Sequence, residues 1–415
     1  MKKENFKSWK EFALSDVCNV FSGTSAPQAK EYFSPTGKPF IRVSDLAVFG
    51  RTNNLISCRD RVSERAVKEK RLILARRGTV LFPKSGAAIL NNNRALLGID
   101  AYIVNHLAAI TPRKAIDSRF LFYLFCGIDM RQYIPNPSYP SLNLSALKQM
   151  KVFLPTIDGQ PDIAEQKRIA DKLDKLFAEI DKAIKNTQAA LEYAEKILQS
   201  ELQKIFGGEI SANWGYERIG KVCDVFSGTS APQDRAYFSA EGKPFIRVSD
   251  LAVYGRTSNL VSCRDYVNEQ AIKEKRLVLA QKGTVLFPKS GAAILNNNRA
   301  LLGVDAYIVN HLAAITPMGN IDSRFLFYFL CNIDMAQYIP NPSYPSLRLS
   351  EIKQIKLFLP VKNGQPDIAE QKRIADRLDK LYMQVEQLKV KYKEQLDCWF
   401  KLKQSLLNKA FQGEL

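Results

Sequence analysis

The feature that most constrains this chain is an internal repeat that runs through nearly its whole length. Three long segments recur 205 residues later: FSGTSAPQ at 21–28 and 226–233, FIRVSDLAV at 40–48 and 245–253, and LFPKSGAAILNNNRALLG at 81–98 and 286–303. Solenoid repeats have periods of roughly 20–50 residues, so a unit of this size is too long for one. Each copy is therefore expected to fold around a core of its own.

The first part of each copy reads as mainly β. Runs rich in β-branched and aromatic residues, such as PFIRVSD, RLILARRGTVLFP, ALLGIDAYIVN and MKVFLP, are bounded by Gly, Pro and Asn. A short helix is expected at DSRFLFYLFCGIDM.

From Pro161 the pattern changes to an apolar period of 3.5, which predicts a helix of about 40 residues. Its stripe consists of Ile169, Leu173, Leu176, Ile180, Ala183, Thr187, Ala190, Ala194 and Ile197. The equivalent stripe of the second copy consists of Ile374, Leu378, Leu381, Val385, Leu388, Tyr392, Trp399 and Leu402.

Each long helix needs a partner for its apolar seam, and the helix of the other copy is the expected one, packed antiparallel as a coiled-coil spacer. The alternative is that each helix packs on its own domain. The fold class is α+β: two similar, mainly β domains, each followed by a long helix, with pseudo-two-fold symmetry. The predicted boundaries are 1–158 and 209–363 for the two domains, and 159–208 and 364–415 for the helices.

The charge of the chain points to a polyanionic partner. Lys and Arg number 60 against 42 Asp and Glu, which gives a formal net charge of +18. Solvated helix faces are the alternative explanation for many of these charges. No apolar run of 18 residues is present, and MKKENFKSWKEF lacks the apolar segment of a signal peptide. We therefore expect a cytoplasmic protein that does not enter membranes.

Cysteine and histidine give no sign of a metal site. Six of the seven cysteines are three positions seen twice, and no C-x-x-C pair occurs, so we expect buried free thiols. The two histidines, His106 and His311, also occupy one position seen twice, inside the apolar run YIVNHLAAI. We expect them to be core residues rather than ligands or bases.

Three segments look like catalytic motifs without being complete. NPSY at 136–139 is close to the N-P-P-Y of amino-methyltransferases, but no G-x-G for a cofactor-binding turn is present. Asp162 and Glu165 in PDIAEQK are spaced as a helix capping box rather than as a nuclease metal site. GTVLFPKS at 78–85 lacks the second glycine of a phosphate-binding loop. We therefore predict no catalytic residue, no metal and no cofactor bound by this chain.

The doubled arrangement resembles the specificity subunit of type I restriction-modification systems. In that family a recognition domain closes with an L-x-L-S segment, then L-P and an E-Q-x-x-I-A-x-x-L-D helix, and the whole arrangement occurs twice. This chain has SLNLSALKQMKVFLP at 141–155 followed by AEQKRIADKLDKL at 164–176, and SLRLSEIKQIKLFLP at 346–360 followed by AEQKRIADRLDKL at 369–381. The resemblance covers essentially the full length.

The resemblance implies a non-catalytic subunit that binds double-stranded DNA and chooses the site for adenine methylation or cleavage. It would dock two methyltransferase subunits and, in the restricting complex, motor-nuclease subunits, with S-adenosylmethionine, ATP and Mg held only by those partners. Most such subunits carry two dissimilar recognition domains, whereas these two are nearly identical. Two identical readers related by a two-fold axis would read an interrupted palindrome.

Polar loop residues are the candidates for DNA contact, because their donors and acceptors suit phosphates and base edges. In the first copy they are Ser22, Thr24, Ser25, Gln28, Arg42, Ser44, Asp45, Lys84, Ser85, Asn91, Asn92, Asn93, Arg94 and Tyr139. In the second copy they are Ser227, Thr229, Ser230, Gln233, Arg247, Ser249, Asp250, Lys289, Ser290, Asn296, Asn297, Asn298, Arg299 and Tyr344.

Other interpretations of these residues stay open at this stage. Asn runs commonly build turns, and Arg42 with Asp45 could form an internal ion pair. For the whole chain, the alternatives are a stand-alone methyltransferase or nuclease and a coiled-coil scaffold without DNA contact. The copies differ at Arg113–Lys114 against Met318–Gly319 and at Asn143 against Arg348. These differences lie largely outside the candidate loops, so both copies are expected to read the same half-site.

Overall fold

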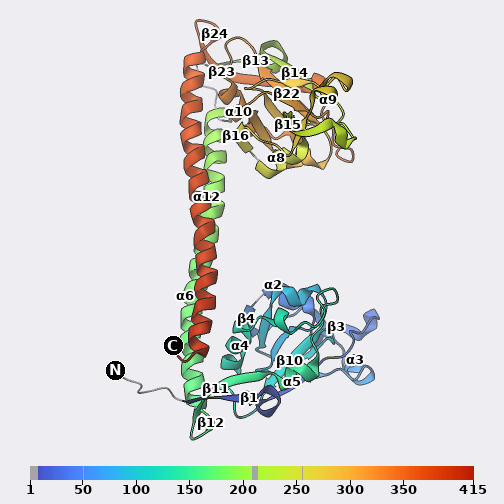
Figure 1. Cartoon of the computed structure of the whole chain (residues 1–415), viewed down its shortest axis with the longest axis vertical. Helices are drawn as coiled ribbons and strands as arrows, with labels where there is room; N and C mark the ends of the chain where they lie inside the picture. Colours follow the sequence, from blue (N-terminus) through green and yellow to red (C-terminus); the bar gives the residue numbers. More distant parts are fainter. Residues whose placement is uncertain (1–7, 50, 208–213, 255) are drawn as a thin grey trace, which may run out of the picture. The chain divides into compact units, whose positions relative to one another are not determined.

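The structure is a computed structural model that describes residues 8–49, 51–207, 214–254 and 256–415. The chain divides into two compact units. Unit 1 comprises residues 1–187 and 394–415, and unit 2 comprises residues 188–393. Each unit therefore contains one mainly β domain, the first part of the long helix that follows it, and the last part of the other copy's long helix (Figure 1).

The domain of unit 1 is built from a three-stranded, a five-stranded and a four-stranded sheet, with strand orders β1-β11-β12, β2-β10-β7-β8-β4 and β5-β3-β9-β6. The strands are β1 Ser8–Ala13, β2 Cys18–Ser22, β3 Phe33–Ile41, β4 Arg51–Leu55, β5 Asp60–Val62, β6 Leu74–Ala75, β7 Val80–Pro83, β8 Arg94–Leu97, β9 Ala101–Ile103, β10 Leu107–Pro112, β11 Lys151–Ile157 and β12 Gln160–Pro161. The helices are α1 Leu14–Val17, α2 Val43–Phe49, α3 Glu64–Glu69, α4 Ser118–Gly127 and α5 Leu144–Gln149, with short 3-10 turns η1 Lys30–Tyr32, η2 Ala87–Asn91 and η3 Met130–Tyr133.

The domain of unit 2 repeats this topology, with strand orders β13-β23-β24, β14-β22-β19-β20-β16 and β17-β15-β21-β18. Its strands are β13 Trp214–Arg218, β14 Cys223–Ser227, β15 Phe238–Ile246, β16 Arg256–Leu260, β17 Asp265–Val267, β18 Leu279–Ala280, β19 Val285–Pro288, β20 Arg299–Leu302, β21 Ala306–Ile308, β22 Leu312–Pro317, β23 Lys356–Lys362 and β24 Gln365–Pro366. Its helices are α7 Ile219–Val222, α8 Val248–Tyr254, α9 Glu269–Glu274, α10 Ser323–Asn332 and α11 Leu349–Gln354, with η4 Arg235–Tyr237, η5 Ala292–Asn296 and η6 Met335–Tyr338.

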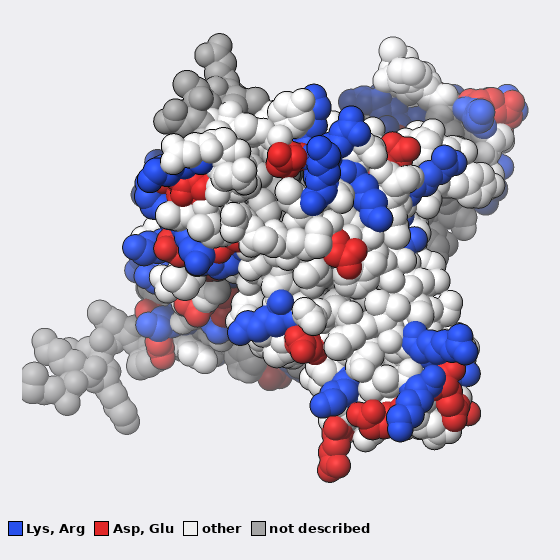
Figure 2. Space-filling model, turned by 90° about the horizontal axis from the view of Figure 1, so that it is seen from above, with Lys and Arg blue, Asp and Glu red and all other residues white. Residues whose placement is uncertain are grey.

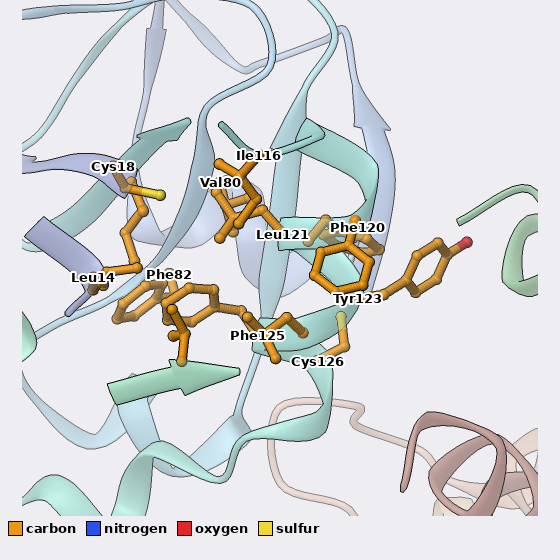
Figure 3. Close-up of a cluster of buried hydrophobic side chains, with 14 of the residues drawn as sticks. Leu14, Cys18, Val80, Phe82, Ile116, Phe120, Leu121, Tyr123, Phe125 and Cys126 are labelled. Atoms are coloured by element: carbon orange, nitrogen blue, oxygen red, sulfur yellow. The ribbon is translucent and has the colours of Figure 1, made fainter. Parts of the chain in front are cut away.

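Each domain has two core clusters, and the larger one lies between the five-stranded sheet and the central helix. In unit 1, α4 begins at Asp117, whose carboxylate accepts hydrogen bonds from the backbone N–H groups of Arg119 and Phe120. The helix is apolar nearly all round, which favours burial on every side. The Phe125 ring stacks on Phe82 of β7 with ring centroids 5.5 Å apart, in a core cluster that also holds Val80, Phe120 and Leu121 (Figure 3).

The two long helices are α6, Ile163–Phe206, and α12, Ile368–Phe411, each of 44 residues. The predicted cap of α6 is present, because the Asp162 carboxylate accepts the backbone N–H of Glu165 at 3.0 Å. Asp367 caps α12 in the same way, at 3.1 Å.

Within each unit the two helices run antiparallel. In unit 1, Arg168 near the start of α6 donates to the Leu415 carbonyl oxygen at 2.6 Å, and Lys403 pairs with Asp181. In unit 2, Arg377 near the start of α12 pairs with Glu201 near the end of α6. The predicted α+β fold with paired antiparallel helices is confirmed.

Each domain core is completed by the end of the other copy's helix. In unit 1 the Phe411 ring packs edge-on against Phe120, with ring centroids 5.3 Å apart. The equivalent pair in unit 2 is Phe206 and Phe325, at 5.4 Å. Leu407 in unit 1 and Leu202 in unit 2 are fully buried in these cores. The sequence analysis expected each helix to pack on the other helix or, as the alternative, on its own domain. In the structure each helix packs both on its partner helix and on a domain.

Several residues in the later parts of the predicted apolar stripes are not buried. Ile197, Leu388 and Leu402 are 42%, 36% and 40% exposed, whereas Leu202 and Leu407 are buried. An α-helix has 3.6 residues per turn, so a strict 3.5-residue stripe drifts by about 20° per heptad. The buried face therefore moves along the sequence toward the ends of the helices.

Candidate nucleic-acid interface

Four strands of the unit 1 domain end at the same edge of its sheets. β3 and β9 are parallel, with Ile41 opposite Ile103 at their last residues, and the next residue, Val104, donates to the Ile41 carbonyl oxygen at 3.1 Å. The Thr24 N–H, just past β2, donates to the Ile103 carbonyl oxygen at 3.2 Å. The loops that follow β2, β3 and β9 therefore emerge together.

The loop after β7 and a distant proline-rich loop join this edge. The Lys84 N–H donates to the His106 carbonyl oxygen at 2.9 Å, which fixes the end of β7 beside the turn between β9 and β10. The Gly86 N–H donates to the Pro140 carbonyl oxygen at 2.8 Å, and the Leu142 N–H donates to the Lys84 carbonyl oxygen at 2.8 Å. We call the surface formed by residues 22–28, 84–91, 105–106 and 136–141 the loop face.

The proline-rich loop presents an aromatic ring on a stiff turn. The Asn136 side-chain oxygen accepts the Ser138 N–H at 2.9 Å, and the Asn136 carbonyl oxygen accepts the Tyr139 N–H at 3.2 Å. Prolines at 137 and 140 restrict the backbone further. Tyr139 is 80% exposed at the tip of this turn, so its ring is free to stack or donate a hydrogen bond.

Close backbone approach explains the glycine in FSGTSAPQ. A Cβ atom on Gly23 would lie 1.8 Å from the Ile103 carbonyl oxygen, so a larger residue would separate the loop from β9. The side chains that the loop leaves exposed are Ser25 and Gln28. The Thr24 hydroxyl oxygen is enclosed and, within the described residues, has no hydrogen-bond partner. This burial counts against the predicted DNA contact of the Thr24 hydroxyl and, equivalently, of the Thr229 hydroxyl.

The loop face is free of acidic residues and carries the cation Lys84, so it offers polar donors and acceptors to an anionic ligand. On the face of the molecule shown in Figure 2, Lys and Arg atoms lie in separate groups, many beside Asp or Glu, with broad uncharged areas between them. The high net charge thus does not form one continuous basic patch on that face.

The segment after β3 is only partly available for binding. The Asp45 carboxylate is 5% exposed and accepts the backbone N–H groups of Arg42 and Arg59, at 2.7 and 3.1 Å. The ion pair of Arg42 is with Asp60 rather than with Asp45. Asp45, and equally Asp250, thus holds its own loop, which counts against their predicted role in reading DNA. Ser44 is exposed and stays a candidate.

The Asn run predicted to read DNA divides into an exposed and a buried part. Arg94 is 1% exposed, and its guanidinium donates to the carbonyl oxygens of Phe125, Asn93 and Ile128 and to the Asn92 side chain. Arg299 is 1% exposed in the same arrangement. Burial lowers the pKa of both arginines to about 10.

Asn92 has the left-handed backbone conformation (φ 55°) that ends η2, and its side-chain oxygen also accepts the Met130 N–H at 3.3 Å. These contacts tie the loop to the end of α4. The enclosure of the guanidinium groups counts against the predicted DNA contacts of Arg94 and Arg299. Asn91 is exposed and Asn93 half-buried, so both stay candidates.

The sequence interpretation missed Asn105 and His106. His106 was expected in the core, but it is exposed in the tight turn between β9 and β10, and its Nδ1 atom lies 2.6 Å from the Ser85 hydroxyl oxygen. Asn105 Nδ2 donates to the Ser25 hydroxyl at 3.4 Å. An Asn–His pair between two apolar runs is a turn signal, which could have identified both residues.

Unit 2 has the same loop face at the equivalent positions. The Ser290–His311 distance is again 2.6 Å, the Lys289 N–H donates to the His311 carbonyl oxygen at 2.9 Å, and Tyr344 is 80% exposed. Ser230, Gln233 and Ser249 are exposed, as are their counterparts in unit 1. Both domains thus present one constellation of polar loops.

Within the described ranges, the sequence predicts buried free thiols and no metal site. No group of three or more His, Cys, Asp or Glu side chains that could hold a metal ion occurs there. Cys18, Cys126, Cys223 and Cys331 are buried free thiols, and burial raises the pKa of Cys18 and Cys223 to about 12. Cys58 and Cys263 are half-buried, and the unrepeated Cys398 is exposed. None of the helices over these residues is long and apolar enough to cross a membrane.

The fold and loops define a tandem recognition protein: two equivalent β domains, each with one polar loop face, joined by long helices. The family model of the type I restriction modification DNA specificity domain matches residues 7–192 and, a second time, residues 211–397. The chain therefore belongs to this family, whose subunits recognise DNA and are not the catalytic subunits of their enzymes.

Known relatives span nearly the whole chain. The type I restriction enzyme MjaIX specificity subunit of Methanocaldococcus jannaschii is 26% identical over 435 residues, covering 99% of this chain and 94% of the relative. The type I restriction enzyme EcoprrI specificity subunit of Escherichia coli is 24% identical, covering 89% of this chain and 87% of the relative.

Solved structures share the fold. A chain from a structural study of complex assembly and conformational transition of the type I R-M system has a TM-score of 0.76 at 19% identity, with 98% of each chain covered. The HsdS subunit from Thermoanaerobacter tengcongensis has a TM-score of 0.53 at 20% identity, covering 98% of this chain and 97% of that one.

Proposed function

We propose that this specificity subunit reads a bipartite, palindromic target in double-stranded DNA, one half-site with each loop face. The observation that carries the proposal is that both units present the same exposed polar side chains on the same hydrogen-bonded loops. Identical readers select identical half-sites. The proposed contacts on each loop face come from Ser25, Gln28, Lys84, Ser85, Asn91 and Tyr139 and their counterparts 205 residues later.

Inverted rather than direct half-sites are favoured by the direction of the helices. Within each unit α6 and α12 run antiparallel, and the two helices are equivalent members of the repeat. In this proposal a rotation about a two-fold axis exchanges the two equivalent helices. Readers related by such an axis bind reverse-complementary half-sites separated by a spacer.

In this proposal the chain supplies recognition and its partners supply chemistry. It docks methyltransferase subunits and, in the restricting complex, motor-nuclease subunits in the cytoplasm. S-adenosylmethionine, ATP and Mg are bound by those partners. The long helices are the natural docking elements, since exposed apolar side chains such as Tyr193, Val390 and Phe400 lie along them.

The test is co-expression with the cognate methyltransferase subunit, followed by sequencing that maps methyladenine. An interrupted palindrome is the expected target. A direct repeat or an asymmetric site would contradict the inverted geometry, and methylation directed by the chain without a methyltransferase partner would contradict the division of labour.

The repeat itself offers matched controls for the loop face. Tyr139→Ala weakens one half-site and Tyr344→Ala the other, and the double variant weakens both. Base stacking on an aromatic side chain contributes about 1–3 kcal/mol, so each single variant should lower DNA affinity about tenfold. Tyr216→Ala, which removes a 55% exposed ring from β13 outside the loop face, should leave affinity unchanged. Equal losses from Tyr216→Ala would contradict the assignment of the loop face.

A further inference from the structure

We infer that His106 and His311 each read a base in the major groove, at equivalent positions of the two half-sites. This inference rests on the proposed function and assigns specificity to two residues that a pattern of apolar neighbours would place in the core. They are the two histidines of the chain. Both are exposed, and each belongs to a loop face.

The imidazole of His106 is positioned by the loop that follows β7. Its Nδ1 atom is 2.6 Å from the Ser85 hydroxyl oxygen, and its own carbonyl oxygen accepts the Lys84 N–H at 2.9 Å. Ser85 is itself bridged to Ser141 of the proline-rich loop. The ring therefore contacts the Ser85 hydroxyl, and Ser85 is itself held by the proline-rich loop.

With Nδ1 engaged, Nε2 is the ring nitrogen left for a ligand. In a neutral imidazole one nitrogen carries the proton and the other accepts, and the hydrogen bond made by one decides the role of the other. When the Ser85 hydroxyl donates to Nδ1, the proton resides on Nε2, which becomes a donor. The acceptors that the major groove offers such a donor are purine N7, guanine O6 and thymine O4.

The surroundings favour a nucleic-acid ligand for this donor. The loop face carries no Asp or Glu in either copy, so its own segments offer no carboxylate to the ring. Lys84 supplies a positive charge next in sequence to Ser85, suited to a phosphate. Asn105 adds a second polar side chain from the same turn, hydrogen-bonded to Ser25. The same distances recur around His311.

Two substitutions separate the proposed contact of Nε2 with a base from the contact of Nδ1 with Ser85. The amide of Asn reaches the position of Nδ1 and can keep the contact with Ser85, whereas the amide of Gln reaches the position of Nε2. In the complex with the methyltransferase subunit, H106N with H311N should relax one base position in each half of the methylated motif. A base contact contributes about 1–3 kcal/mol of discrimination, so preference at that position should fall about tenfold or more.

The matched variants define the opposite outcomes. H106Q with H311Q should keep the wild-type motif, and H311N alone should relax one half only. An unchanged motif in the double Asn variant, or equal relaxation by the Asn and Gln variants, would overturn the inference. A wild-type complex that directs no sequence-specific methylation would instead refute the proposed function.

A second measurement uses the wild-type complex and does not depend on how variants fold. Diethylpyrocarbonate modifies accessible imidazoles, and peptide mass spectrometry locates the modification. Cognate DNA should protect His106 and His311 several-fold more strongly than a duplex of scrambled sequence. Equal modification with either duplex would show that the rings do not meet the bases and would overturn the inference.

Discussion

The two units share a loop face but differ at the seam where the domain meets the long helices. In unit 1 a cavity of about 290 Å³ opens at this seam, lined among others by Arg51, Phe177 and Lys403. In unit 2 the residue equivalent to Phe177 is Tyr382, whose hydroxyl donates to the Arg256 carbonyl oxygen at 2.8 Å. Arg256 in turn donates to Gln199 at 2.7 Å.

This difference contrasts with the loop faces, which the proposed function assigns to one repeated ligand. The two loop faces consist of identical residues, whereas the two seams differ. The residues of a seam contact only other residues of the same chain. A change in the domain can therefore be compensated by a change in the long helices. Under the proposed function each loop face has to fit the same half-site, so it would have no such freedom.

The largest expected effect is on the buried arginines, which should behave equally in both units. Arg94→Ala or Arg299→Ala leaves several carbonyl and amide oxygens without a donor, each costing about 1–3 kcal/mol. We expect the free energy of unfolding of the affected unit to fall by about 4 kcal/mol, measured by denaturant titration. Arg131→Ala, whose side chain is 60% exposed, is the control and should change it little. A large difference between the two arginine variants would break the equivalence of the cores.

The next effect tests whether the end of each long helix stabilises the domain of the other copy. Leu407→Ala should destabilise unit 1 and Leu202→Ala should destabilise unit 2, each by about 3 kcal/mol, because both side chains are fully buried in a domain of the other copy. Hydrogen exchange read by mass spectrometry should become faster in residues 8–187 for Leu407→Ala and in 214–393 for Leu202→Ala. If hydrogen exchange became faster only in the domain of the copy that carries the substitution, the helix end would not be part of the other copy's core.

A smaller effect concerns pH and should again be equal in both units. Partial burial acts to raise the pKa of Asp60, but hydrogen bonds and charge from Arg59 and Arg42 outweigh it and hold the pKa below its ordinary value. Asp265 is lowered in the same way. A depressed carboxyl pKa stabilises the fold above the ordinary value, and this contribution is lost as pH falls through the folded-state pKa.

Asp60→Asn or Asp265→Asn should therefore cost about 1 kcal/mol near neutral pH and progressively less in acid below about pH 4. Unfolding titrations over this range provide the measurement. A penalty that grows on acidification would have the wrong sign.

The smallest effect sharpens the difference between the seams. Tyr382→Phe removes the hydrogen bond to the Arg256 carbonyl oxygen and should lower the stability of unit 2 by about 1 kcal/mol. The reverse change in unit 1, Phe177→Tyr, should be close to neutral, since its hydroxyl would enter the existing cavity. Thermal unfolding compares the two. Equal penalties would mean that the seams are energetically alike.

Much of the fold could be predicted from local sequence. The 205-residue repeat, the β-rich domains and the long helices follow from periodicity and from caps such as Asp162. Site residues were harder. Residue type alone does not distinguish an exposed Asn91 from Asn92, whose side chain is hydrogen-bonded to Arg94 and Met130.

The sequence by itself determined that this chain holds two copies of one unit and that their candidate loops match. Both conclusions rest on identity between segments, which needs no knowledge of contacts. Only the tertiary structure decided that Arg94 is enclosed, that His106 is exposed, and that Phe411 completes the first domain. These outcomes depend on strands and helices distant in the sequence, and burial is a property of the neighbours that surround a residue rather than of the residue itself.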